Sequence, residues 1–350
     1  MNDLRPPLEL MGVPGSPYTR KMLALLRFRR IPYRLLPSLR NSISPDIERF
    51  EARPSPKVPL LPTFYLKDDS GQEQAVCDTT PLIREFEIQY EDRSVIPENT
   101  VMAFIDYLLE DYADEWLTKA MFHYRWAYEA DIEKAGQMLP RWNNITASDE
   151  EIAKLSQAIS QRQISRLSYV GSNAVTTQTI EESFHRFIDL LNNHFQNLPF
   201  LLGKRPAACD FAIYGQLICL ALFDPTPQKI ILERAPRVYA WTEVMEDLSG
   251  YEILEDDWLA AGELPETLIA ILGEVGRIYV PYLLANAEAV ANRQDLLEME
   301  LDGRPWQQNP FTYQAKCLHW LREKQSQLTE PQKEQLSELI RSTGIDSLFN

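Results

Sequence analysis

The sequence predicts an α/β domain over residues 1–92 and an all-helical domain over residues 93–350. Strand and helix patterns alternate in the first part, whereas strand patterns nearly vanish from Thr100 onward. The charge divides at the same place. Of the 35 basic and 51 acidic residues, 13 of each lie in residues 1–92, so the remainder carries the whole net charge of −16. A neutral part and a strongly acidic part indicate two domains that meet near residue 92.

The first three elements form a βαβ pattern. Leu8–Val13 is a short apolar run that ends in a Gly- and Pro-containing loop, which is typical of a strand. Ser16 and Pro17 then open a helix, because Ser is a favoured N-cap and Pro suits the first helical position. Tyr33–Pro37 is predicted to be the second strand.

The next three elements form a ββα pattern. Residues 58–66 and 74–77 look like two strands joined by a turn at residues 68–71. Thr80 and Pro81 repeat the helix-opening signal, and an apolar face follows them. The order βαβ and then ββα predicts a compact α/β unit with a mixed sheet.

Helical periodicity dominates the rest of the chain, and the stretch between Tyr128 and Asp149 has weak periodicity that predicts a loop or a frayed helix. The last hundred residues, from about 255, form a helical extension for which the residues suggest no chemistry. The predicted helices are Val101–Tyr128, Asp149–Tyr169, Thr179–Asn197, Asp210–Leu222, Val238–Leu248, Pro265–Ala291, Tyr313–Gln327 and Pro331–Ser342.

Composition excludes several classes of protein. The net charge of −16 and the isoelectric point near 4.8 argue against a nucleic-acid binder. The longest nearly apolar run, Phe211–Phe223, is too short to span a bilayer, so we expect no membrane partner. The four cysteines are scattered and have no metal-ligand spacing to the four histidines. We therefore expect no metal site and a reduced, cytoplasmic protein.

Three local motifs resemble the cytosolic glutathione S-transferase family of the serine type. Ser16–Lys21 is similar to the family's Ser-Pro-aromatic motif at the start of the first helix. Lys57–Leu60 resembles the segment in which a proline after a hydrophobic residue is cis, which here would be Pro59. Asp78–Pro81 resembles the acidic and hydroxyl pair that holds the γ-glutamyl end of glutathione. The resemblance implies a thioredoxin-like N-terminal domain followed by an all-α domain.

A fourth match lies in the helical part. Phe200–Phe211 resembles the family's folding motif, in which a Ser or Thr caps a central helix and an Asp returns the hydrogen bond. Ala207 stands where the capping hydroxyl is expected, and losing such a cap usually costs about 1 kcal/mol. The resemblance covers roughly residues 8 to 250, so the extension lies beyond the usual family length.

The resemblance also implies a glutathione site. Ser16 would stabilise the thiolate of glutathione, with Tyr18 as a substitute donor. Lys57 would contact the glycyl carboxylate, and Val58 would offer its backbone to the cysteinyl moiety, next to Pro59. Asp78 and Thr79 would hold the γ-glutamyl end.

The acceptor substrate would lie against the first long helix of the helical domain. There the resemblance points to Tyr112 and Trp116, although such aromatic stripes more often form core. Arg20 and Lys21 are the basic residues nearest the predicted thiol, and they would help to attract an anion.

Elementary chemistry agrees with a serine-stabilised thiolate. A hydrogen bond to a charged group is worth about 1.5–3 kcal/mol, and about 1.4 kcal/mol equals one pKa unit. One serine hydroxyl would therefore lower a thiol pKa from near 8.5 by roughly 1–2 units. Ser16, Asp78 and Thr79 also have a plainer interpretation as helix caps, and Tyr18 as a packing residue.

We therefore predict a glutathione transferase that joins glutathione to a small hydrophobic electrophile, acts as a homodimer and needs no metal. Two alternatives remain open. One is a non-catalytic protein that keeps the fold to bind a protein partner, and the other is a glutathione-dependent isomerase or lyase. The combination of Ser16, Lys57 and Asp78 favours the transferase over the partner-binding protein, because a scaffold does not need the three together.

Overall fold

The protein is described by a computed structural model, which covers residues 4–37, 53–254, 257–262 and 264–349. Its N-terminal part is a four-stranded mixed sheet in the order β2-β1-β3-β4. The strands β1 and β2 are parallel, whereas β3 is antiparallel to both β1 and β4. The strands are β1 (Leu8–Gly12), β2 (Tyr33–Pro37), β3 (Thr63–Lys67) and β4 (Glu73–Val76).

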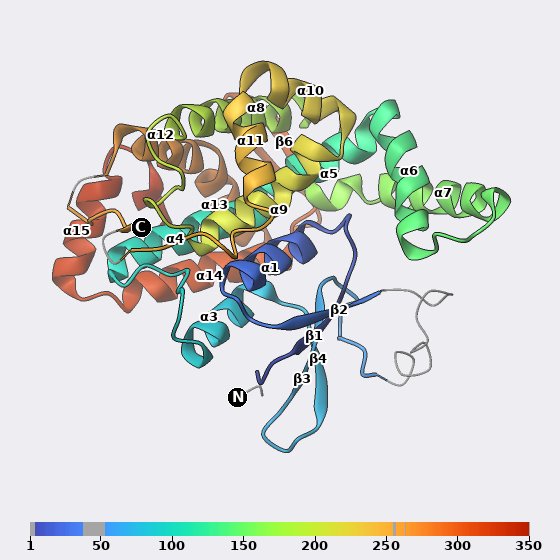
Figure 1. Ribbon diagram of the computed structural model, residues 1–350. Helices are drawn as coiled ribbons and strands as arrows, with labels where there is room; N and C mark the ends of the chain where they lie inside the picture. The colour runs from blue at the N-terminus through green and yellow to red at the C-terminus, as the bar shows by residue number, and fades with distance from the viewer. Residues whose placement is uncertain (1–3, 38–52, 255–256, 263, 350) are drawn as a thin grey trace.

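Two helices complete the N-terminal part as the sequence predicts. Helix α1 (Pro17–Phe28) begins at Ser16, whose hydroxyl oxygen accepts a hydrogen bond from the Thr19 amide at 3.2 Å. Helix α3 (Thr79–Gln89) begins at the end of β4, with Asp78 at its N-cap. Both helix starts therefore lie beside the sheet, close in sequence to strand ends (Figure 1).

The remaining chain is mostly helical and packs above the sheet (Figure 1). Helix α9 is buried along nearly its whole length at the centre of this part. The helices are α4 (Thr100–Tyr112), α5 (Thr118–Ala127), α6 (Glu129–Asn143), α7 (Asp149–Ile164), α8 (Thr177–His194), α9 (Ala208–Leu222), α10 (Pro225–Arg234), α11 (Pro236–Val244), α12 (Glu266–Glu274), α13 (Val280–Ala291), α14 (Thr312–Ser326) and α15 (Glu330–Ile340).

Four short helical segments complete the list. Two π-helical segments lie between longer helices, η1 (Ala113–Leu117) between α4 and α5 and η4 (Val275–Tyr279) between α12 and α13. The 3₁₀ segments are η2 (Leu167–Val170) and η5 (Ile345–Phe349).

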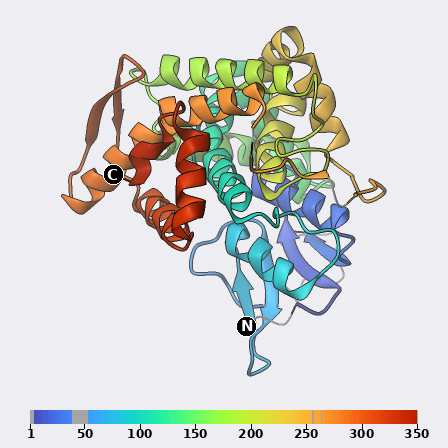
Figure 2. The ribbon, with the colours of Figure 1, turned by 90° about the vertical axis from the view of Figure 1, so that its left-hand side faces the viewer.

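Three features of the helical part differ from the sequence prediction, and one of them is α10, which forms between the predicted helices Asp210–Leu222 and Val238–Leu248. The stretch between Tyr128 and Asp149, predicted to be a loop or a frayed helix, is largely the regular helix α6, which packs against α7. Its buried residues are few and include Gly136 and Pro140, which explains why its apolar periodicity is weak. Residues 297–308 form a hairpin of β5 (Leu297–Leu301) and β6 (Arg304–Gln308), which projects from the helices in Figure 2.

Helix α1 joins the two parts of the molecule by packing against α9. Gly215 on α9 makes the contact possible, because a Cβ atom there would lie 2.7 Å from the Pro17 carbonyl oxygen. Lys21 on α1 is fully buried and pairs with Glu110 at 2.8 Å and with Asp114 at 2.6 Å. The proposed domain boundary near residue 92 remains a prediction.

One helical stretch among the described residues, Glu266–Ala291, is long and apolar enough to cross a bilayer, with a mean hydropathy of 1.5. The bent pair of α9 and α10 passes the same test as a single broken span. These tests consider length and composition alone, and buried core helices pass them too. More than half of the Glu266–Ala291 window, 56%, is buried inside the protein.

Candidate functional site

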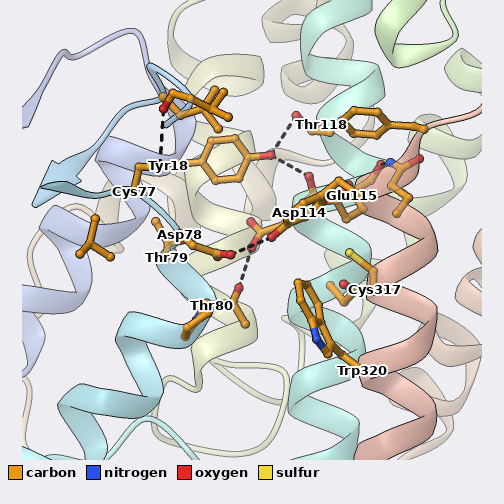
Figure 3. Close-up of a pocket in the computed structure, with 18 of the residues that line it drawn as sticks. Tyr18, Cys77, Asp78, Thr79, Thr80, Asp114, Glu115, Thr118, Cys317 and Trp320 are labelled. Atoms are coloured by element: carbon orange, nitrogen blue, oxygen red, sulfur yellow. Dashed lines mark hydrogen bonds between the residues drawn. The ribbon is translucent and has the colours of Figure 1, made fainter. Parts of the chain in front are cut away.

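A cavity of about 980 Å³ lies between the N-terminal part and the helical part. The first wall comes from the segment before β3 and from the junction of β4 and α3. The second wall is the continuous helix formed by α4, η1 and α5, and the third is α14 from the C-terminal extension (Figure 3). The cavity therefore joins segments that are more than 200 residues apart in sequence.

Most of the predicted glutathione-binding residues line the first wall. Lys57 and Val58 are exposed at the cavity, and Asp78 and Thr79 lie at the start of α3 beside them. Leu61, which the sequence did not single out, also lines this wall.

The cis peptide bond is not where the resemblance placed it. It joins Leu61 to Pro62, immediately before β3, whereas the bond between Val58 and Pro59 is trans, and Pro59 does not line the cavity. The cis proline is therefore Pro62, three residues after the predicted Pro59. The sequence Lys57–Pro62 contains two prolines that each follow a hydrophobic residue, so the motif fits at either position.

Ser16 lies behind the first wall. Its hydroxyl accepts a hydrogen bond from the Thr19 amide and donates one to the Leu61 carbonyl oxygen at 3.2 Å. It is not among the residues that line the cavity. The structure thus places Ser16 against the main chain of a lining residue, one hydrogen bond away from the cavity.

Tyr18 lines the cavity itself. Its hydroxyl donates a hydrogen bond to the Asp114 carbonyl oxygen at 2.7 Å and lies 3.5 Å from the Thr118 hydroxyl (Figure 3). Burial, together with the nearby Asp114 and Glu115, raises the pKa of Tyr18 well above its usual value. Tyr18 is therefore protonated at neutral pH and is available as a hydrogen-bond donor.

Asp78 is already bound by a residue from the C-terminal extension. The Tyr313 hydroxyl on α14 donates a hydrogen bond to Asp78 Oδ2 at 3.1 Å. The Asp78 side chain does not cap α3, although Asp78 occupies the N-cap position. Its carboxylate therefore faces the cavity and not the amides of its own helix.

Tyr112 and Trp116 do not line the cavity. Their exposed fractions are 1% and 2%, and they pack in the core, Tyr112 against Phe187 and Trp116 against Trp306. One residue along a helix turns the side chain by about 100°, so the neighbours Asp111 and Glu115 face the cavity instead. The prediction that these two aromatic residues form the acceptor pocket is therefore not met.

The helix wall is acidic rather than aromatic. Burial raises the pKa of Asp111 to about 7 and of Asp114 to about 6, and it raises the pKa of Glu115 well above its usual value. Burial also lowers the pKa of Lys119, further along the same wall, to about 7. Lys119 donates hydrogen bonds to Tyr282, Gln308 and a main-chain carbonyl.

Arg20 and Lys21 do not serve the cavity as the sequence suggested. Arg20 pairs with Glu246, and Lys21 is enclosed by Glu110 and Asp114. Since these charges are compensated, neither forms a free positive patch for an anionic thiol.

The third wall was missed by the sequence. Phe311, Tyr313, Gln314, Cys317 and Trp320 all face the cavity from α14 or from its first turn. The aromatic character of residues 311–320 is visible in the sequence, but nothing there indicates which surface they meet.

Two cysteines also line the cavity. Burial raises the pKa of Cys77 and of Cys317, with nearby carboxylates acting in the same direction. Both thiols are therefore protonated near neutral pH, which disfavours them as nucleophiles. Among the described residues, no group of three His, Cys, Asp or Glu side chains is placed to hold a metal ion.

Comparison with known proteins gives one family match, in the first part of the chain. Residues 10–94 match the sequence profile of the glutathione S-transferase N-terminal domain. No curated protein sequence matches the chain.

Several solved structures overlap with the protein in part. A GST-like protein from Pseudomonas syringae has 16% identity and a TM-score of 0.40, and the overlap covers 68% of this chain and 66% of that one. A glutathione S-transferase from Methylobacterium radiotolerans, in complex with glutathione sulfonate, has 13% identity and a TM-score of 0.39, covering 72% and 99%. A maleylacetoacetate isomerase from Anaeromyxobacter dehalogenans has 12% identity and a TM-score of 0.33, covering 74% and 97%. At these values the overlaps carry no conclusion about activity.

The predicted fold class is confirmed in its main parts, since a thioredoxin-like mixed α/β domain is followed by a mostly helical region. The family match is to the glutathione S-transferase N-terminal domain, and it extends over residues 10–94 of the 350-residue chain.

Proposed function

We propose that the protein binds glutathione in the cavity and transfers its thiolate to a hydrophobic electrophile. One observation carries the proposal. The residues of the family-matched domain that would hold glutathione, including Lys57, Leu61, Asp78 and Thr79, line one wall of a single cavity, and helices from the rest of the chain close it. The volume of about 980 Å³ accommodates a tripeptide and a second substrate.

The first wall suits the chemistry of glutathione. The start of α3 offers free N–H groups and a partial positive charge to the γ-glutamyl carboxylate. Asp78 would take the γ-glutamyl ammonium, and Lys57 the glycyl carboxylate. The main chain of Leu61 would receive the cysteinyl unit in place of Val58, because Leu61 lies directly before β3 at the cavity.

Ser16 would supply the hydrogen bond that stabilises the thiolate. Its hydroxyl can keep accepting from the Thr19 amide while its proton turns from the Leu61 carbonyl oxygen to the sulfur. The thiolate then attacks the electrophilic carbon of the acceptor, a C–S bond forms, and the leaving group departs with the bonding pair. Tyr18 is the substitute donor, and its proton would turn from the Asp114 carbonyl oxygen.

A second candidate is a non-catalytic protein that uses the fold to bind a protein partner. Three hydrogen bonds favour this second candidate, because they already use the groups that glutathione would need. The hydroxyls of Ser16 and Tyr18 both donate to main-chain oxygens, and the Tyr313 hydroxyl donates to the Asp78 carboxylate. Each bond must be replaced when glutathione binds. A glutathione-dependent isomerase or lyase would use the same site, and product analysis would separate it from conjugation.

Calorimetric titration with glutathione near neutral pH tests the proposal first. Saturable binding that is lost in Asp78→Ala and kept in the surface variant Glu298→Gln supports the site. An electrophile screen on the same samples then tests transfer. Absence of binding at millimolar glutathione would reject the transferase in favour of the partner-binding protein. The homodimer and the cytoplasmic location stay predictions, and light scattering tests the former.

A further inference from the structure

Three hydrogen-bond donors from three different helices meet at one end of the cavity. Arg84 lies on α3, Tyr107 on α4 and Lys324 on α14, and all three line the cavity. The Lys324 ammonium lies 4.5 Å from the centre of the Tyr107 ring, and the Arg84 guanidinium lies 5.0 Å from it. Both cations therefore lie against the same ring. We call Arg84, Tyr107 and Lys324 the basic end.

The Tyr107 hydroxyl is a donor that the protein does not use. The residue is only 7% exposed and lines the cavity, and its hydroxyl forms no hydrogen bond with a described residue. The oxygen is not one of the buried atoms that lack a partner, so it retains access to the cavity. Burial raises the pKa of Tyr107 well above its usual value, so the hydroxyl keeps its proton and can donate it to a ligand.

The Lys324 ammonium also lacks a partner. Within the described part of the chain it forms neither an ion pair nor a hydrogen bond, and it lies only against the Tyr107 ring. Partial burial and the neighbouring Arg84 lower the pKa of Lys324, because both disfavour its positive charge. A bound anion would remove this penalty and accept the unused hydrogen bonds.

Arg84 adds a second positive charge beside Lys324. Its Nη1 pairs with Glu110 and lies 3.5 Å from the Thr80 carbonyl oxygen. Its Nη2 lies 3.8 Å from Asp106 Oδ2, which is too far for a hydrogen bond, and that oxygen has no partner among the described residues. Arg84 is therefore fixed in place by Glu110, and its Nη2 remains without an acceptor.

The ion pairs next to the basic end leave one cation over. Lys21 pairs with Glu110 and Asp114, and Arg84 pairs with Glu110. Two cations thus face two carboxylates, and Lys324 is the third cation.

The other carboxyl groups nearby compensate Lys324 poorly. Burial raises the pKa values of Asp106 and Asp111 to about 7, so both are largely protonated in slightly acidic solution. Glu323 also lines the cavity, but it is exposed to water, which screens its charge. One uncompensated positive charge favours a monoanion such as a carboxylate over a phosphate monoester, which carries almost two charges.

We propose that the basic end binds a carboxylate group of the acceptor substrate. The identification of this ligand as the acceptor rests on the proposed transferase function, whereas the binding of the carboxylate does not. The carboxylate would accept hydrogen bonds from Tyr107 and Lys324, with Arg84 adding positive charge beside them. The rest of the molecule would be aromatic, because Trp320, one turn before Lys324 on α14, points into the cavity and offers its ring (Figure 3).

Three naphthyl compounds of similar size test the binding without glutathione: naphthoate, naphthamide and naphthylmethylammonium. Calorimetry at about pH 6.5, where Asp106 and Asp111 are largely protonated, should show at least tenfold tighter binding of the carboxylate than of the amide. The ammonium should not bind. Equal binding of the carboxylate and the amide, or binding of neither, would overturn the proposal.

Two conservative variants test whether the carboxylate lies at the basic end. Lys324→Met should remove most of the preference for the carboxylate. Tyr107→Phe keeps the ring and should weaken naphthoate binding by roughly 3- to 10-fold. Lys316→Met changes an exposed lysine on the same helix, outside the cavity lining, and should retain the full preference. A preference that survives both Lys324→Met and Tyr107→Phe would reject the basic end as the site.

Glutathione carries carboxylates of its own, so a second arm separates the two sources. The affinity for naphthoate should stay the same when glutathione is saturating, and Lys324→Met should not change the Kd of glutathione. Competition between the two ligands would show that the basic end holds a carboxylate of glutathione, which would overturn its assignment to the acceptor.

A third arm measures transfer to chloronitrobenzoate and to chloronitrobenzamide. Attack of the thiolate forms a C–S bond at the ring carbon and releases chloride. Relative to the uncatalysed rate, kcat/KM should be higher for the benzoate in the wild type but not in Lys324→Met. A carboxylate preference in binding without any conjugation rejects the transferase and keeps the basic end as an anion site. Conjugation without a preference for the benzoate does the reverse.

Discussion

At the scale of single residues, the candidate site is defined by hydroxyl groups that already have partners. Ser16 donates to Leu61, Tyr18 donates to Asp114, and Tyr313 donates to Asp78. Each of these protons must turn toward glutathione if it is to take part in binding or in chemistry. The three residues can therefore be separated by removing one hydroxyl at a time.

Ser16→Ala should lower kcat/KM roughly 10- to 150-fold, because a hydrogen bond to the charged sulfur is worth about 1.5–3 kcal/mol. The same change removes the N-cap of α1 and should cost about 1 kcal/mol of stability in urea. Ser16→Thr keeps both the cap and the hydroxyl and should restore most of the activity. A larger loss in Tyr18→Phe than in Ser16→Ala would show instead that Tyr18 is the donor.

Tyr313→Phe should tighten glutathione binding. The hydroxyl of Tyr313 occupies Asp78 Oδ2, and the γ-glutamyl ammonium must replace it there. Removing that competitor should lower Kd by roughly 3- to 10-fold, which corresponds to about 0.7–1.4 kcal/mol. Calorimetry with both proteins measures this directly. Weaker binding in the variant would mean that Tyr313 contacts glutathione itself.

At the scale of secondary-structure elements, the continuous helix from α4 to α5 packs one face into the core and turns another face toward the cavity. Tyr112 and Trp116 face the core, whereas Asp111, Asp114 and Glu115 face the cavity. The π-helical segment η1 carries two of these carboxyl groups, and such segments often occur at functional sites. The cost of burying these carboxyl groups should be visible as a pH dependence of stability.

Asp111→Asn should stabilise the protein more at high pH than at low pH. The folded-state pKa of Asp111 is about 7, and the unfolded value is near 3.9, so the stability associated with its proton is present below about pH 4 and is lost as the pH rises through 7. Asparagine can still accept the hydrogen bond from Tyr279. Unfolding in urea at about pH 5 and pH 8 measures the difference between variant and wild type, in which the other titrating groups cancel. A difference that does not grow with pH would contradict the shift.

Helix α9 offers a second test at this scale, because its cap is half complete. Asp210 accepts hydrogen bonds from the amides of Ala207 and Leu201, but Ala207 has no hydroxyl to return one. Ala207→Ser should supply it and raise the free energy of unfolding by about 1 kcal/mol. Ala208→Ser, one residue into the helix, is the matched control and should give no gain. The control matters because both positions are fully buried.

At the scale of the whole molecule, the C-terminal extension completes the cavity. Helix α14 lies beside α4 and is held by α13, where the Asn286 side chain makes two hydrogen bonds to the main chain of Phe311, at 2.9 and 2.8 Å. The Tyr282 hydroxyl donates a hydrogen bond to the Gln314 side chain at 2.5 Å, and Gln314 in turn donates to the Glu115 carbonyl oxygen at 3.0 Å. The third wall thus depends on contacts that lie outside the family-matched domain.

Asn286→Ala should loosen this wall. It removes two partly buried hydrogen bonds and leaves the Phe311 amide without its Asn286 partner, at a cost of about 1–3 kcal/mol, whereas the Phe311 carbonyl oxygen still accepts from the Ala315 amide. Hydrogen exchange should rise in residues 311–326, while exchange in α9 should stay slow. Asn309→Ala removes one exposed hydrogen bond near the same place and is the matched control. Uniform protection in both variants would show that α14 is held by its apolar contacts alone.

The sequence by itself predicted the order of elements in the N-terminal domain, both helix starts at the cavity and most of the residues on the first wall. These depend on local signals, such as Ser16 before Pro17 and Asp78 before α3, which act over a few residues. It predicted only a loop or a frayed helix where α6 forms, because few side chains of α6 are buried. It did not predict α10 or the hairpin at residues 297–308, which is short and distant from the N-terminal sheet.

The tertiary structure decided which face of each helix meets the cavity. It placed Tyr112 and Trp116 in the core and Asp111 and Glu115 at the site, and it brought Tyr313 to Asp78 across 235 residues. Periodicity identifies an apolar stripe but not the surface that the stripe meets. Burial and charge pairing arise only when distant helices pack together, so the acidic wall, its raised pKa values and the role of the C-terminal extension follow from the fold and not from local sequence.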